Sequence, residues 1–311
     1  MTKKPIIIDG DPGQDDVMAV LLAAGCGEFD IKGVTCVAGN CSVDNGVNNM
    51  LKVVDYLGLD IPIIRGAATP LRGEPHPAKG AHGAKGNNGP ILPPAKSKAL
   101  DVKAVDFIAS VLQESDAPMT IVPLGPLTNI AEFMMCYPDL ICKIERLVLM
   151  GGGALSYGNM TPTAEYNFWH DPEAARIVFR SGVPITMAGL DVTEKALVTP
   201  EDSARFRAIG NKAGAMAADM MDFYSARAIR TGWAGGRLHD PVTIYWMLKP
   251  EKLVSAEYYV EVDVFGEFTR GAALVDMAHA WPEETPQTTV LFDLDREDYI
   301  DTIAKALANL N

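Results

Sequence analysis

The sequence predicts an α/β fold with an open, mainly parallel (mixed) sheet and helices on both of its faces. Short runs of aliphatic and β-branched residues alternate with longer segments whose apolar residues recur at helical spacing. The short runs are apolar throughout, as in strands that are buried on both sides. Right-handed crossovers between such strands place helices on the two faces of the sheet.

The elements before residue 200 follow this alternation. Strands are expected at residues 6–8, 31–37, 119–122, 147–150 and 185–188, and helices at 17–24, 47–57, 127–135 and 173–179. In sheets of this kind, ligands bind beyond the carboxyl ends of the strands. The residues that follow each strand are therefore the candidates for a functional site.

The alternation changes after residue 200. A long helical tract is expected over 200–230, a helix over 241–248, strands near 258–264, 272–275 and 288–292, and a capped helix over 295–310. We find no low-complexity linker or internal repeat that divides the chain, so we expect one domain over 1–311. Segments 66–100 and 231–239 are rich in glycine and are expected to be lid-like loops, with ordinary surface loops as the alternative.

Composition excludes several classes of partner. The net charge of −13 argues against nucleic acid, which requires a basic surface. No apolar run approaches the roughly 20 residues that span a bilayer, and the one after Lys3 and Lys4 is too short for a signal peptide. The five cysteines show no C-x-x-C spacing, which favours reduced thiols over disulfides or a zinc site. We expect a soluble cytoplasmic protein that binds neither nucleic acid nor membranes.

Four carboxylates follow the first expected strand: Asp9, Asp11, Asp15 and Asp16. Like charges this close raise one another's pKa unless a cation neutralises them, and ligand sets made only of oxygen suit Ca²⁺ or Mg²⁺. The alternative is that Asp15 and Asp16 only stabilise the N-terminus of the next helix. Since that explains one or two of the four aspartates, the sequence favours a metal site.

Further polar groups come from later strand ends. Asn40, Leu124 and Met150 lie beside glycines that permit close approach of a ligand, although such turns also occur in ordinary loops. Glu165 and Asn167 alternate on a segment predicted to be extended, so both side chains can face a sugar; a solvated loop is the alternative.

His239 and Asp240 directly precede a helix that starts with proline. Histidine titrates near neutrality, so His239 is a candidate general acid, and Asp240 is a candidate metal ligand. The alternative is that this histidine has only a structural role.

Taken together, these motifs resemble the nucleoside hydrolase family, of the inosine–uridine preferring type. The residues that carry the resemblance are Asp9-Gly10-Asp11-Pro12-Gly13-Gln14-Asp15-Asp16, Gly39-Asn40, Pro123-Leu124-Gly125-Pro126-Leu127-Thr128-Asn129, Met150-Gly151-Gly152-Gly153, Glu165-Tyr166-Asn167 and His239-Asp240-Pro241. The resemblance implies a Rossmann-like fold, a homodimer or homotetramer, and Ca²⁺-dependent hydrolysis of ribonucleosides to a free base and ribose.

The resemblance also implies roles for individual residues. Calcium would be held by Asp11, Asp16, the Leu124 carbonyl and Asp240; ribose would be bound by Asp15, Asn40, Asn159, Glu165 and Asn167, with Met150 packed against it. Asp11 would be the general base, His239 the acid that protonates the leaving base, and Asp9 a supporting residue. An oxocarbenium-like transition state requires this combination of a nearby anion, an activated water and a proton for the leaving group.

The lid-like loops depart from the family pattern. His82, Tyr224 and Trp233 are the expected substrate contacts there, but the stretch after His82 lacks an apolar residue common in the family. Ala228 stands where family members often have a base-contacting tyrosine, and Trp233 is the candidate to replace it. The preferred base therefore stays open.

Two other functions compete with nucleoside hydrolysis. The first is a haloacid-dehalogenase-like, Mg²⁺-dependent phosphatase, which also has an Asp-x-Asp after its first strand; here Pro12-Gly13 departs from that pattern. The second is a noncatalytic, calcium-dependent nucleoside- or sugar-binding protein.

Overall fold

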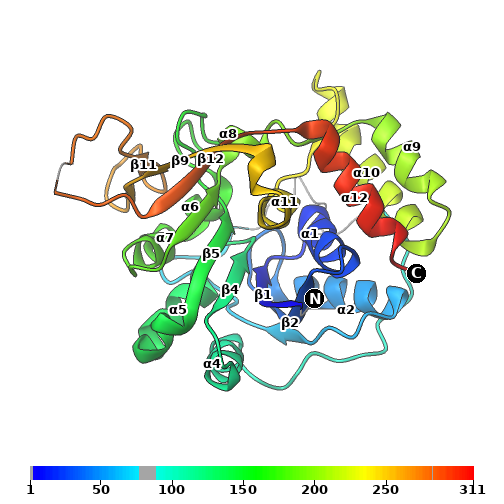
Figure 1. Ribbon diagram of the computed structural model, residues 1–311, viewed down its shortest axis with the longest axis horizontal. Coiled ribbons are helices and arrows are strands. Elements are labelled where there is room, and N and C mark those ends of the chain that lie inside the picture. Colours follow the sequence, from blue (N-terminus) through cyan, green and yellow to red (C-terminus); the bar gives the residue numbers. More distant parts are fainter. Residues whose placement is uncertain (1–2, 77–88, 282) are drawn as a thin grey trace.

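The computed structural model describes residues 3–76, 89–281 and 283–311. In that part of the chain, eight strands form one central sheet in the order β3-β2-β1-β4-β5-β6-β12-β9, flanked by helices on both faces (Figure 1). Neighbouring strands are parallel except that β9 runs antiparallel to β12 at the sheet edge. The predicted fold class is confirmed.

The central sheet consists of β1 (Lys4–Gly10), β2 (Phe29–Cys36), β3 (Ile63–Arg65), β4 (Met119–Pro123), β5 (Ile144–Met150), β6 (Ile185–Ala188), β9 (Leu253–Tyr258) and β12 (Thr288–Leu294). Two small antiparallel pairs are formed by β7 (Leu197–Val198) with β8 (Gly236–Arg237), and by β10 (Val260–Val262) with β11 (Ala273–Val275). The helices are α1 (Gln14–Gly25), α2 (Val43–Leu57), α4 (Ala104–Glu114), α5 (Thr128–Cys136), α6 (Tyr166–His170), α7 (Pro172–Phe179), α8 (Leu190–Thr193), α9 (Pro200–Ala208), α10 (Lys212–Arg230), α11 (Pro241–Leu248) and α12 (Arg296–Ala308), with 3₁₀ turns at Pro138–Lys143 and Pro250–Lys252.

Strand β1 shows why the sequence builds layers on both sides of the sheet. Successive side chains of a strand point to opposite faces, and all three isoleucines of β1 are fully buried. Ile6 and Ile8 pack in a core with residues of α1, α2, α10, α11 and α12, whereas Ile7 packs in a second core with residues of α4, α5 and α7. An apolar run without polar interruptions is what a strand covered on both faces requires.

The strand order creates the position for a ligand site. Strands β2 and β3 lie on one side of β1 in the sheet, whereas β4 and the strands that follow it in the sheet lie on the other side. A crevice opens at such a switch point, beyond the carboxyl ends of the two central strands. Asp11 follows β1 and Leu124 follows β4. The Leu124 amide donates to the Asp9 carbonyl oxygen at 2.6 Å, and this hydrogen bond holds the ends of the two strands next to each other.

The tract predicted as one long helix over 200–230 is two helices, α9 and α10. Between them Gly210 has φ +82°, a left-handed conformation that glycine adopts without steric cost and that ends helices. The predicted strand over 258–264 is also divided, since β9 ends at Tyr258 and β10 begins at Val260.

The second lid-like loop is shorter than predicted. Within segment 231–239, residues Gly236–Arg237 form β8, which pairs with β7, so the prediction of a loop is wrong for this part. In the first segment, the described residues 66–76 and 89–100 contain no helix or named strand, and Leu100 forms a bridge with Ile64.

Within the described ranges, the structure contains no helix that is both long enough and apolar enough to span a lipid bilayer.

Candidate active site

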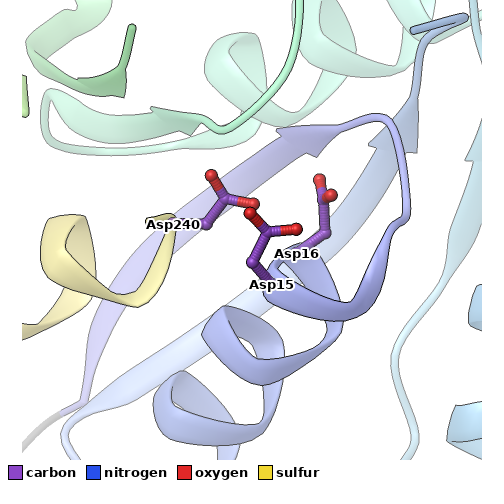
Figure 2. A group of neighbouring side chains, drawn as sticks. All are labelled: Asp15, Asp16 and Asp240. Atoms are coloured by element: carbon purple, nitrogen blue, oxygen red, sulfur yellow. The ribbon is translucent and has the colours of Figure 1, made fainter. Parts of the chain in front are cut away.

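Three buried carboxylates meet at the carboxyl edge of the sheet. Asp15 and Asp16 lie in the first turn of α1, and Asp240 directly precedes α11 (Figure 2). One carboxylate oxygen of each residue lies within 4.8 Å of the others, which makes the group a candidate metal site. In Figure 2 the Asp15 and Asp240 carboxylates approach each other, and the Asp16 side chain extends beside them.

Hydrogen bonds fix the orientation of Asp16. Its Oδ1 accepts from the Asp11 amide at 3.0 Å, and its Oδ2 accepts from the Gly13 amide at 2.9 Å. Gly13 is the N-cap residue of α1, so Asp16 also satisfies a backbone donor at the helix start. The interpretation of this aspartate as a helix-capping residue therefore describes part of what Asp16 does, while its place beside Asp15 and Asp240 is independent of capping.

Asp11 lies against backbone on several sides. Its Oδ2 accepts from the Asn40 amide at 2.5 Å, and the Asn40 side chain reaches Asp16 Oδ2 at 3.4 Å. A Cβ at either Gly39 or Gly125 would collide with the Asp11 carboxylate. These two glycines permit the close backbone approach that the sequence pattern predicts at the strand ends.

Electrostatics makes the cluster unfavourable unless protons or a cation neutralise it. Burial raises the pKa of Asp11 well above its usual range, and the Asp16 charge raises it further. Burial raises the pKa of Asp15 to about 6. The pKa of Asp240 is also raised well above its usual range by burial and then by the charges of Asp15 and Asp16.

The ligands available in this cluster are all oxygen atoms. The charges that act most strongly on Asp240 are other carboxylates: Asp15, Asp16, Asp11 and Glu165. A cation would relieve this repulsion, and hard cations such as Ca²⁺ prefer oxygen ligands, whereas zinc sites in proteins favour sulfur and nitrogen. The donor set therefore fits the metal that the family resemblance implies.

Asn167 joins two neighbouring strand ends. Its Nδ2 donates to the Leu124 carbonyl oxygen at 2.9 Å, after β4, and to the Met150 carbonyl oxygen at 3.1 Å, at the end of β5. The Met150 sulfur lies 3.4 Å from the same amide nitrogen. These three candidate residues are thus brought together in one buried hydrogen-bonded group.

Glu165 and Asn167 are not on an extended segment, and this prediction is wrong. Glu165 is the N-cap residue of the helix α6: its carboxylate accepts from the amides of Asn167 at 2.9 Å and Phe168 at 3.3 Å, and from that of Gly152 at 3.0 Å. The alternative of a solvated loop is also wrong, since Glu165 and Asn167 are 3% and 5% exposed. Burial raises the pKa of Glu165 to about 7.

His239 is half-buried, and its Nδ1 lies 2.8 Å from the Thr193 Oγ1 of α8. Tyr224, on α10, is also half-buried; burial and the charges of Asp15 and Asp240 raise the pKa of its hydroxyl well above its usual range. Tyr224 therefore lies within reach of the charges of Asp15 and Asp240.

The remaining candidates are exposed or lie outside the described residues. Trp233 is 48% exposed, and the Arg237 guanidinium carbon lies 3.7 Å from its ring centroid, so one face of this ring is covered. Asn159 is exposed in the loop between β5 and α6, and the structure does not bring it into the buried group. His82 lies outside the described residues.

Asp9 lies beneath the site. Its Oδ1 accepts from the Thr35 hydroxyl at 2.5 Å and from the Asn129 amide at 2.7 Å, and burial raises its pKa to about 7. Sequence reasoning missed Thr35 and Thr193 as partners of site residues. Asn129 closes the motif after β4 and could have been found by its position, whereas no pattern marks either threonine.

Residues 6–301 match the family model for the inosine-uridine preferring nucleoside hydrolases. The chain belongs to this family. As a nucleoside hydrolase, it hydrolyses ribonucleosides to the free base and ribose. The resemblance inferred from the sequence motifs is confirmed, and membership of this family displaces the phosphatase alternative.

Individual relatives match this nucleoside hydrolase over nearly its whole length. The pyrimidine-specific ribonucleoside hydrolase RihA of Escherichia coli strain K12 is 43% identical over 97% of this chain and 98% of its own. Among solved structures, the purine-preferring ribonucleoside hydrolase from Gardnerella vaginalis is 32% identical, with a TM-score of 0.92 and 98% of both chains covered. A plant nucleoside hydrolase, PpNRh1, is 31% identical, with a TM-score of 0.91 and 99% of both chains covered.

Proposed function

We propose that this nucleoside hydrolase works with Ca²⁺ held by Asp11, Asp16, the Leu124 carbonyl and Asp240. The observation that carries the proposal is the buried group of Asp15, Asp16 and Asp240, whose carboxylates approach one another at the switch point of the sheet. Asp11 is tied to it because its amide donates to Asp16. When bound, the cation would acidify water and orient the 2′- and 3′-hydroxyls of ribose.

Asp11 is the proposed general base. The Asn40 amide holds its Oδ2, which leaves the carboxylate fixed rather than free to rotate. Its raised pKa means that this carboxylate takes up a proton more readily than an exposed aspartate does. A proton from the attacking water would pass to Asp11 as the water adds to the anomeric carbon of the sugar.

Ribose is the proposed ligand of Asp15, Asn40, Asn159, Glu165 and Asn167. All except Asn159 are buried, and the Met150 sulfur contacts the side-chain amide of Asn167. Buried amide and carboxylate groups discriminate strongly for a ligand that carries hydroxyls, because a ligand without them leaves these groups unpaired. His82, Tyr224 and Trp233 are the proposed contacts to the base.

Departure of the base requires a proton, and His239 is its proposed source. His239 directly precedes Asp240 in the chain, so its backbone adjoins that of a proposed cation ligand. A protonated base leaves as a neutral molecule, which lowers the barrier for breaking the glycosidic bond.

Pyrimidine ribonucleosides are the proposed preferred substrates. The support is the name of the RihA relative from Escherichia coli, which shares more of its sequence with this chain than the purine-preferring enzyme from Gardnerella vaginalis does.

A substrate panel tests the proposal. Ribose release from uridine, cytidine, inosine and adenosine is measured with calcium and with a chelator, for the wild type and Asp240→Asn. We expect the highest kcat/KM with the pyrimidines, loss of activity with chelator, and its recovery on adding calcium but not zinc. Exposed Asp101 supplies the control Asp101→Asn, which should match the wild type. Full activity in the presence of chelator would contradict the calcium proposal.

The remaining expectations concern organisation and location. We propose one domain over 1–311, supported by the central sheet that joins strands from both ends of the chain. We propose a homodimer or homotetramer, as the resemblance implies; exposed Phe265 and Phe268 supply apolar surface for such contacts, and light scattering tests it. A cytoplasmic location is supported by the five cysteines, all within the described ranges, which are free thiols.

A further inference from the structure

The Arg237 guanidinium carries a buried N–H for which the described part of the structure offers no acceptor. This group is Nε–H. The ion-pair partner of the side chain is Glu194, but its Oε1 lies 3.7 Å from Nη2, which is too far for a hydrogen bond. Since a buried donor without an acceptor costs free energy, Nε–H is a candidate to receive an acceptor from a ligand.

Hydrogen bonds fix the backbone on both sides of Arg237. The Leu238 amide donates to the Ala196 carbonyl oxygen at 2.8 Å. On the other side, the Gly236 amide donates to the Ser225 hydroxyl oxygen at 3.0 Å. The fold therefore sets the point from which the Arg237 side chain extends.

Arg237 lies beside both aromatic residues that are proposed to contact the base. Its guanidinium carbon lies 3.7 Å from the Trp233 ring centroid. A Cβ at Gly236, the preceding residue, would lie 2.9 Å from Tyr224 Cδ1, so this strand packs directly on Tyr224. Burial and then the carboxylates of the cluster raise the pKa of the Tyr224 hydroxyl, and the Arg237 charge opposes them. Arg237 thus brings a positive charge to the proposed base site.

Two structural roles account for only part of these contacts. Stacking on Trp233 uses the charge of the guanidinium but supplies no oxygen to accept from Nε–H. Pairing with Glu194 contributes little, because the Glu194 side chain is 39% exposed and such pairs are weakened by solvent. Neither role accounts for the buried N–H.

A guanidinium is well suited to recognise a carbonyl oxygen. It is always charged, and its planar shape holds the N–H groups in fixed directions, so its hydrogen bonds are strong and directional. In uridine and cytidine, the 2-carbonyl group adjoins the ring nitrogen that carries ribose. In purine nucleosides, neither carbon next to that nitrogen carries an oxygen. A donor at this end of the base therefore separates the two classes of nucleoside.

The position of Arg237 favours the carbonyl group that lies next to ribose. Asp240, a proposed cation ligand, follows it by three residues in the chain. Asp15, a proposed ribose ligand, acts with Arg237 on the same Tyr224 hydroxyl. The end of the base that faces Arg237 is therefore expected to be the end attached to the sugar.

We propose that Arg237 is a specificity-determining residue that donates a hydrogen bond to the 2-carbonyl oxygen of a pyrimidine base. This inference rests on the proposed base site between Tyr224 and Trp233, and it deepens the proposed preference for pyrimidines by assigning it to one side chain. When a purine nucleoside binds, the Arg237 Nε–H stays buried without an acceptor, which disfavours that substrate.

The test pairs a change in the enzyme with a change in one atom of the substrate. Arg237→Met keeps an apolar side chain against Trp233 and removes the donors. In 2-thiouridine and 4-thiouridine, sulfur, a weak acceptor, replaces one carbonyl oxygen of uridine. We expect Arg237→Met to lower kcat/KM for uridine and 4-thiouridine by about 10- to 100-fold, as for loss of a hydrogen bond from a charged group, and for 2-thiouridine by less than about threefold. The preference for uridine over inosine should fall by the same factor as uridine turnover.

Glu194→Gln is the control for a structural role. It removes the ion-pair partner of Arg237 and should change kcat/KM for all three uridines by less than about threefold. Equal losses on the three uridines with Arg237→Met would overturn the proposal, because that is the result of a merely structural role. A loss that is spared only with 4-thiouridine would overturn the assignment to the 2-carbonyl oxygen.

A binding measurement separates this inference from the proposed function. If the wild type turns over no nucleoside at all, the proposed function fails. Calorimetric titration of the wild type and Arg237→Met with uridine and 2-thiouridine then measures the same dependence on the 2-carbonyl oxygen without hydrolysis. A loss of affinity for uridine alone supports the role of Arg237, whereas equal losses for both ligands, or no binding of either by the wild type, overturn it.

Discussion

The Asn167 side-chain amide lies 2.9 Å from the Leu124 carbonyl oxygen. A residue proposed to bind ribose therefore donates a hydrogen bond to a group proposed to bind the metal. A carbonyl oxygen has two lone pairs, and this hydrogen bond uses one and leaves the other for a cation. The same amide nitrogen holds the Met150 carbonyl at 3.1 Å. Sugar binding and cation binding are therefore expected to depend on one side chain.

Replacing Asn167 with Ala should weaken both kinds of binding. Loss of a residue that orients a metal ligand typically lowers metal affinity by about 10- to 100-fold, and we expect that range for calcium here. The KM for the nucleoside should rise as well, because the hydroxyls lose a buried partner. Calorimetric titration with calcium and steady-state kinetics measure the two effects. Asn48→Ala, at an exposed position of α2, is the matched control; a rise in KM with unchanged calcium affinity would contradict the coupling.

Replacing Asp11 with Ala should lower kcat by more than about 10³-fold without unfolding the protein, because the change removes both a base and a cation ligand. Burial beside Asp16 raises the pKa of Asp11, which means that its charge destabilises the metal-free fold. The metal-free variant should therefore have a Tm equal to or above that of the wild type. Thermal unfolding followed by circular dichroism, with kcat measured on the same preparation, checks both outcomes. Activity within tenfold of the wild type would exclude Asp11 as the base.

Calcium should raise Tm more at pH 8 than at pH 5.5. Burial raises the pKa of Asp15 from 3.8 to about 6 and that of Glu165 from 4.5 to about 7, so the metal-free folded protein keeps protons that the unfolded chain has already lost. The stability that these groups contribute is fully present below about pH 4 and is lost as pH rises through 6 to 7.

Calcium competes with those protons, and its stabilising effect should grow over the same pH range. Scanning calorimetry of metal-free and calcium-loaded protein at the two pH values measures the difference. An equal shift at both values, or a larger one at pH 5.5, would contradict this account of the cluster.

Replacing Asp171 with Ala should destabilise the fold by about 3 kcal/mol. This carboxylate is fully buried and accepts from the Leu71 amide at 2.8 Å, the Thr128 hydroxyl at 2.7 Å and the Ala174 amide at 3.1 Å. The substitution removes a helix N-cap and leaves two further donors unpaired, at roughly 1 kcal/mol each. Urea unfolding measures the loss, with Asp101→Ala as the exposed control.

The same variant also tests whether Asp171 anchors the segment around Leu71, through the hydrogen bond from the Leu71 amide. Amide hydrogen exchange at Leu71 should accelerate in Asp171→Ala, whereas exchange in β1 should change only as much as the overall stability does. If exchange at Leu71 stays at the wild-type rate, Asp171 does not anchor that segment.

Much of the fold was predictable because its signals are local. The buried strands are apolar throughout, α7 begins with the Asp171 cap and a proline, and α11 begins with another proline. The acidic group after β1 and Asp240 before α11 were likewise visible as residues that follow a strand or precede a helix. These features depend on few neighbours in space.

The missed features depend on distant parts of the chain. Helix α6 has only five residues, and its segment was predicted to be extended. The helix forms because the carboxylate of Glu165 stabilises its start and burial of Phe168 stabilises the rest. The Leu124 carbonyl and the Thr193 hydroxyl acquire their roles only when other elements bring Asn167 and His239 to them. Periodicity in the sequence carries no information about such pairings.

The strand order also has a consequence for refolding. Asp11 and Leu124 follow β1 and β4, which pair side by side although α1, β2, α2, β3 and α4 lie between them along the chain. Contacts between residues so far apart in sequence form slowly, since the intervening loop must first close. Return of hydrolysis after dilution from denaturant therefore cannot precede the pairing of β1 with β4. The recovery of enzyme activity would therefore report when β1 and β4 have paired. It can be compared with the earlier recovery of the circular dichroism signal of the helices.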